Sequence, residues 1–137
     1  MHFEYSVVEG DFANAGKASS EIKKTMNQLN IDSQKIKRMV VAVYEAEVNA
    51  IAHAYGGTIF VDIDSEKIVV VIKDTGPGIP DIDKAMEKGF STASSKVREM
   101  GFGAGMGLPN IKNNVDVLEL KSEMGIGTEI KMIVNFM

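Results

Sequence analysis

The chain has 137 residues, 45% of them hydrophobic, with no cysteine and a formal net charge of −4 at pH 7. We expect a single domain spanning residues 1–137, because this length suits one hydrophobic core. The absence of cysteine excludes disulfides and thiolate metal sites, and the acidic balance argues against nucleic acid or an anionic membrane as the main partner. No apolar run approaches the ~20 residues that span a bilayer, and no signal peptide is visible. We therefore expect a cytoplasmic protein.

Apolar periodicity and turn residues predict strands and helices in alternation. In chain order we expect a strand at 3–8, a helix from 14 or 15 to 29, a longer helix from 32 or 33 to about 54, strands at 58–64 and 67–73, a short helix at 82–88, a helix from 108 to about 115, and a closing hairpin of strands at 117–122 and 128–136. This order predicts an α/β two-layer sandwich, with helices on one face of a mixed, mostly antiparallel sheet.

The longer helix carries an apolar stripe and a separate polar strip. At 3.6 residues per turn, four apolar side chains fall within a sector of roughly 80°. These core candidates are Ile36, Val40, Val43 and Ile51. Glu45, Asn49 and His53 follow one another at intervals of four and share a different side. Such a strip, taken alone, is most often the solvated face of an amphipathic helix.

Two glycine-rich stretches indicate a nucleotide site. DTGPGIPD at 74–81 begins where the β-branched run at 68–72 stops, and GFGAGMGL at 101–108 leads into a predicted helix. Glycines let the backbone approach a ligand closely, and amides at a helix start favour anionic oxygens. The carboxylate of Asp74 can accept a hydrogen bond from an exocyclic amine. Either stretch alone is more often a turn or a flexible loop, but the two together suggest a purine nucleotide with phosphates.

With these motifs the chain resembles the GHKL ATP-binding superfamily, which includes DNA gyrase, histidine kinases and mismatch-repair ATPases. EAEVNAIAH at 45–53 resembles the N box, 74–78 the G1 box, 101–107 the G2 box, and 127–128 the final glycine turn. The four motifs occur in the family's order, and the resemblance implies the Bergerat-type ATP-binding fold with ATP or ADP and Mg²⁺ as ligands.

The resemblance, together with the residue types, assigns a role to each main side chain. Asn49 offers a neutral amide oxygen as a Mg²⁺ ligand, and Glu45 is placed to orient or deprotonate an attacking hydroxyl or water. Asp74 is expected to accept a hydrogen bond from the adenine amino group and to reject guanine, with the Thr128 hydroxyl in the same network. His53 is left without a role.

The remaining candidate ligands of ATP lie in the glycine motifs and between them. The resemblance implies contacts from Gly76, Gly78, Ile79, Gly103, Gly105, Met106, Gly107 and Leu108. Residues 89–106 are rich in small polar side chains and predict a lid that is mobile without nucleotide and ordered by a γ-phosphate. Lys96 and Arg98 are its candidate phosphate contacts, with ordinary exposed charge as an equal alternative for each.

Within the superfamily, VAVYEAEVNAIAH at 41–53 and GPGIPDIDKAM at 76–86 are similar to the bacterial anti-sigma factors that are serine kinases. This resemblance implies a sigma factor or an anti-sigma factor antagonist as protein partner, phosphoryl transfer to a serine of the antagonist, and the option of a homodimer. The G2 box is more glycine-rich than is usual there and closer to that of histidine kinases. A nucleotide-gated protein-binding module without kinase activity, or a stand-alone histidine-kinase-like ATP-binding domain, therefore remains an alternative.

Overall fold

The computed structural model describes residues 1–8, 10–53, 56–75, 107–123 and 125–136. The elements in chain order are β1 (His2–Val8), a 3-10 turn (Phe12–Asn14), α1 (Lys17–Gln28), α2 (Ser33–His53), β2 (Gly56–Ile63), β3 (Lys67–Asp74), α5 (Gly107–Asn114), β4 (Val117–Glu123) and β5 (Gly127–Asn135). The strands and helices predicted in these ranges are confirmed to within a few residues at each end, and the helix predicted at 82–88 lies outside the described residues. Within the described ranges, no helix is both long and apolar enough to cross a membrane.

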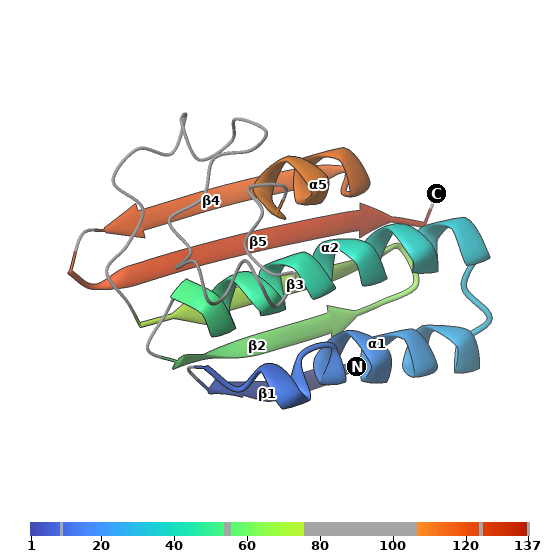
Figure 1. Ribbon diagram of the computed structural model, residues 1–137. Coiled ribbons are helices and arrows are strands. Elements are labelled where there is room, and N and C mark those ends of the chain that lie inside the picture. The colour runs from blue at the N-terminus through green and yellow to red at the C-terminus, as the bar shows by residue number, and fades with distance from the viewer. Residues whose placement is uncertain (9, 54–55, 76–106, 124, 137) are drawn as a thin grey trace.

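The five strands form one sheet in the order β1-β2-β3-β5-β4. Every pairing among these strands is antiparallel, where the sequence suggested a mixed, mostly antiparallel sheet. The α-helices of the described residues, α1, α2 and α5, lie on one face of the sheet, with α2 between the other two (Figure 1). This is the predicted two-layer α/β sandwich, and it brings the end of β3 beside the starts of β2 and β5, because Asp74 pairs with Gly57 and Thr128 contacts Asp74.

The core lies between the helices and the inner face of the sheet. Alternate residues of the central strands are buried, as the period of two along a strand requires. These include Ile59, Val61, Ile68, Val70, Ile72, Ile130, Met132 and Val134. On α2 the predicted apolar stripe is confirmed, since Ile36, Val43 and Ile51 are buried and Val40 packs against the core.

The first helix begins later than its sequence suggested. Residues 12–14 form a separate 3-10 turn, and α1 starts only at Lys17. Between them Gly16 has a φ of 91°, in the left-handed region that favours glycine. A Cβ added at Gly16 would come within 3.3 Å of the Tyr44 ring. The positive φ and the nearby Tyr44 ring therefore both favour glycine at position 16.

A buried carboxylate from α2 caps the start of α1. Gly16 offers no side-chain cap, and Glu47, only 4% exposed, fills that place. Its carboxylate accepts hydrogen bonds from the backbone N–H groups of Ala18 (3.2 Å) and Ser19 (3.5 Å). Burial raises the pKa of Glu47, while the backbone N–H groups of α1 oppose that rise. Glu47 thus fixes the packing of α1 on the helix that carries the polar strip.

Replacing Glu47 with alanine should lower the free energy of unfolding by about 2–4 kcal/mol, because two buried N–H groups lose their acceptor and a cavity is left. Denaturant titration of the purified variant would measure this loss. Glu21→Ala is the matched control, since Glu21 is an exposed carboxylate on α1, and we expect it to change stability by less than about 0.5 kcal/mol. Equal losses from the two substitutions would show that Glu47 does not cap α1.

Candidate functional site

Two predicted site residues lie one turn apart on α2, and both are half-buried. Glu45 and Asn49 occupy the same side of the helix because residues four apart are neighbours on a helix surface. The Glu45 carboxylate accepts a hydrogen bond from the side-chain amide of Asn110 on α5, with Nδ2 and Oε1 3.4 Å apart. The side of α2 that carries Glu45 therefore faces α5. His53 is the last residue of the same helix.

Asp74 ends the central strand β3 and is half-buried there. The backbone N–H of Thr128 on β5 donates to its Oδ1 at 2.9 Å. Burial raises the pKa of the Asp74 carboxyl, and the Thr128 amide opposes this rise. Among the described residues, the second oxygen, Oδ2, has no hydrogen-bond partner. One oxygen is thus fixed, and the other is available to a donor such as an exocyclic amine.

The start of β5 packs directly against Asp74. Thr128 is 8% exposed, and its hydroxyl lies 3.2 Å from the hydroxyl of Ser122 on β4. Before it, Gly127 has a φ of 149°, and a Cβ there would overlap the carbonyl oxygen of Asp74. The predicted glycine turn at 127–128 therefore has a structural basis, because the backbone of β5 approaches Asp74 more closely than a side chain would allow.

The helix that follows the second glycine motif is anchored in the core. α5 begins at Gly107, and Leu108 and Ile111 are buried under it. The side-chain amide of Asn114 donates to the carbonyl oxygen of Asn110 at 2.8 Å. Leu108 is a predicted ATP contact. Because its side chain is buried in the core, only its backbone could make that contact.

Several predicted ligands of ATP lie outside the described residues. They are Gly76, Gly78, Ile79, Lys96, Arg98, Gly103, Gly105 and Met106, together with the lid expected at 89–106. Within the predicted site the structure thus shows two separate contacts. One joins Glu45 to Asn110 on α5, and the other joins Asp74 to Thr128.

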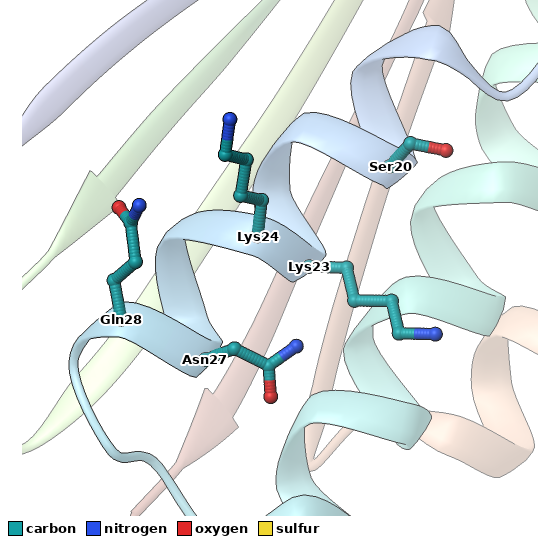
Figure 2. Close-up of a pocket in the computed structure, with 5 residues that line it drawn as sticks. All are labelled: Ser20, Lys23, Lys24, Asn27 and Gln28. Atoms are coloured by element: carbon teal, nitrogen blue, oxygen red, sulfur yellow. The ribbon is translucent and has the colours of Figure 1, made fainter.

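A hollow on α1 is separate from these side chains. Its lining residues, drawn as sticks in Figure 2, all come from the outer face of that helix and are Ser20, Lys23, Lys24, Asn27 and Gln28. None of them belongs to α2, β3, β5 or α5. We place the candidate site between α2 and α5 and at the end of β3, rather than in this hollow.

The described side chains offer polar groups of the kind that can bind a nucleotide and its metal ion. The half-buried amide of Asn49 can supply an oxygen of the kind that Mg²⁺ accepts beside phosphates. Glu45 supplies a carboxylate one turn away, and Asp74 supplies an oriented acceptor. An α/β sandwich of helices on one face of an antiparallel sheet, with these groups at its helix face and strand end, fits the class of nucleotide-binding ATPase domains.

The comparison with protein families agrees with this class. The model of the histidine kinase-like ATPase domain matches residues 8–134. The chain therefore belongs to the histidine kinase-like ATPase family, and the resemblance seen in its four motifs is confirmed.

Two individual proteins show which members of the family this chain is similar to. The chain is 32% identical over 131 residues to the serine/threonine-protein kinase RsbT of Bacillus subtilis (strain 168), covering 93% of this chain and 90% of that protein. It is 36% identical over 110 residues to the anti-sigma F factor of Thermoanaerobacter sp. (strain X514), covering 77% and 73% respectively. The protein is thus an anti-sigma-kinase-like member of the family.

A solved structure confirms the fold. The crystal structure of the RsbU and RsbW domains of Rv1364c from Mycobacterium tuberculosis matches 98% of this chain with a TM-score of 0.66 and 12% sequence identity. This chain corresponds to 32% of that longer one. At this identity the match concerns the architecture alone.

Proposed function

We propose that this protein binds Mg²⁺ and ATP and transfers the γ-phosphate to a serine or threonine of a partner protein. The observation that carries the ATP assignment is the half-buried carboxylate of Asp74, held through Oδ1 by the Thr128 amide. Its second oxygen would accept a hydrogen bond from the adenine amino group. Guanine presents a carbonyl oxygen at that position, and two facing acceptors cost about 1–3 kcal/mol.

The two residues of α2 divide the phosphate chemistry between them. The amide oxygen of Asn49 would hold the Mg²⁺, which neutralises charge on the phosphates. Glu45 takes the proton from the attacking serine or threonine hydroxyl of the partner, while the oxygen of that hydroxyl bonds to the γ-phosphorus. The bond from that phosphorus to the bridging oxygen breaks, and ADP leaves. The names of the relatives, a serine/threonine-protein kinase and an anti-sigma F factor, support transfer to a protein.

The names of the same relatives support our choice of protein partner. A sigma factor, an antagonist of an anti-sigma factor, or both are the proteins that we expect this chain to bind. We also propose that the phosphates are contacted by Lys96, Arg98 and the glycine motifs. Lys96, Arg98 and most of the glycine-motif residues lie outside the described ranges.

The proposal is tested by incubating the purified protein with γ-labelled ATP, Mg²⁺ and each protein encoded beside its gene. We expect label on a serine or threonine of one of these proteins. The control is Asp74→Asn, which replaces the proposed adenine acceptor and should reduce labelling at limiting ATP. If ATP binds and changes the affinity for a partner while no label is transferred, the protein is a nucleotide-gated binding module instead.

The raised pKa of Asp74 gives a second test of the adenine contact. In the free protein we expect its carboxyl carbon to titrate above the usual range of an aspartate, because burial disfavours the charged form. ATP should lower that midpoint, since the amino group of adenine stabilises the ionised carboxylate and binding and ionisation are linked. Correspondingly, ATP affinity should weaken as pH falls through the Asp74 pKa.

Carbon-detected NMR of the carboxyl group, with and without ATP, measures this shift. Asp116 is a control carboxylate, because Arg38 and the backbone N–H of Asn135 already hold its pKa below the usual range, and ATP should leave it unchanged. A midpoint of Asp74 that ATP does not move would place the adenine elsewhere.

A further inference from the structure

We infer that Asn110 is a positioning residue for the proposed phosphoryl transfer, because its side-chain amide holds the Glu45 carboxylate in one orientation. This inference rests on the proposed function. Its basis is the contact between α5 and α2 in which Nδ2 of Asn110 lies 3.4 Å from Oε1 of Glu45, with both residues half-buried. A carboxylate on a helix surface otherwise rotates among several rotamers.

The position of Asn110 is itself well determined. Leu108 and Ile111, on either side of it in sequence, are buried in the core and fix the rotation of α5. One turn further on, the Asn114 amide donates to the carbonyl oxygen of Asn110 at 2.8 Å. The donor that Glu45 meets is therefore carried on a backbone that packing and hydrogen bonding both restrain.

The chemistry of the amide suits a base better than a cation would. A lysine or arginine at Asn110 would hold the carboxylate more strongly, but it would stabilise the ionised form and weaken it as a base. A neutral N–H donor fixes one oxygen of Glu45 and leaves the other oxygen to take a proton. Orientation of this kind matters because a displacement of about 1 Å at a reacting group can cost about 10²-fold in rate.

The test begins with four single-residue variants of this chain. Asn110→Ala removes the donor, and Asn110→Asp keeps the shape while placing a second carboxylate beside Glu45. Asn110→Gln retains the amide. Asn113→Ala is the matched control, because Asn113 is an exposed asparagine of the same helix.

With saturating ATP, Asn110→Ala and Asn110→Asp should each lower the rate of transfer to the partner roughly 10- to 100-fold, with ATP affinity changed by less than about twofold. Asn110→Gln should recover part of the rate, and Asn113→Ala should match the wild type. In a Glu45→Gln background, Asn110→Ala should cause no further loss, because the residue acts through the carboxylate. Wild-type rates in both the alanine and aspartate variants, or a full additional loss in the Glu45→Gln background, would overturn the inference.

A readout without turnover separates this inference from the proposed function. In the nucleotide-free protein, Glu45→Ala removes the acceptor, so it should shift the NMR resonances of the Asn110 side-chain amide and leave those of Asn113 in place. Unmoved Asn110 resonances would overturn the contact. If the wild type transfers phosphate but the Asn110 variants are unimpaired, the positioning role fails alone. If the wild type transfers none, the proposed function fails and the positioning role with it.

Discussion

Replacing Glu45 with glutamine should reduce phosphoryl transfer by about 10²- to 10⁴-fold, the usual contribution of a positioned general base. The substitution keeps the size of the side chain and an oxygen that can accept from Asn110. It removes the ability to take a proton. ATP affinity should stay nearly the same, or rise slightly, since a negative charge near the phosphates is lost.

Single-turnover transfer from γ-labelled ATP and calorimetric titration with ATP separate these two effects. Glu21→Gln is the control, because it makes the same chemical change on the exposed surface of α1. Loss of ATP affinity in Glu45→Gln, with transfer otherwise proportionate to bound ATP, would give Glu45 a binding role in place of the catalytic one.

Replacing Gly127 with alanine should destabilise the fold strongly, because β5 passes very close to Asp74 at this position. The new Cβ would overlap the carbonyl oxygen of Asp74 and lie 3.0 Å from its carbonyl carbon, so the backbones of β3 and β5 would have to separate. The φ of 149° adds strain for any residue with a side chain. We expect a loss of about 3 kcal/mol or more in the free energy of unfolding.

Gly125 supplies the matched control two residues earlier. It also has a positive φ, of 81°, but a Cβ there would meet nothing within 4 Å. Gly125→Ala should therefore cost about 1–2 kcal/mol, from backbone strain alone. Denaturant titration of both variants isolates the steric part, and equal losses would mean that the close approach to Asp74 does not govern the choice of glycine at 127.

The main elements could be predicted because their signals are local. The 3.6-residue apolar period predicts a helix from residue 32 or 33 to about 54, and the structure places α2 at Ser33–His53. The central strand β3 is indicated by the β-branched run at 68–72. The later start of α1 was missed because Gly16, at a φ of 91°, interrupts a segment whose composition still permits a helix.

The contacts that organise the candidate site could not be read in the same way, because they join residues far apart in sequence. No sequence pattern near Glu47 indicates that it caps α1. Likewise, no pattern around Asn110 indicates that its side chain contacts Glu45, which lies 65 positions earlier. Asp74 and the turn at 127–128 were found as separate motifs. Only the pairing of β3 with β5 brings the Thr128 amide within 2.9 Å of the Asp74 carboxylate.

We propose an adenine-specific nucleotide-binding kinase, and calorimetric titration of the wild type with ATP and GTP in the presence of Mg²⁺ tests the adenine contact most directly. We expect GTP to bind at least about tenfold more weakly than ATP, because its carbonyl oxygen would face the Asp74 carboxylate. We also expect Asp74→Asn to remove most of the ATP affinity. Equal affinity for ATP and GTP, or binding of neither, would contradict the account.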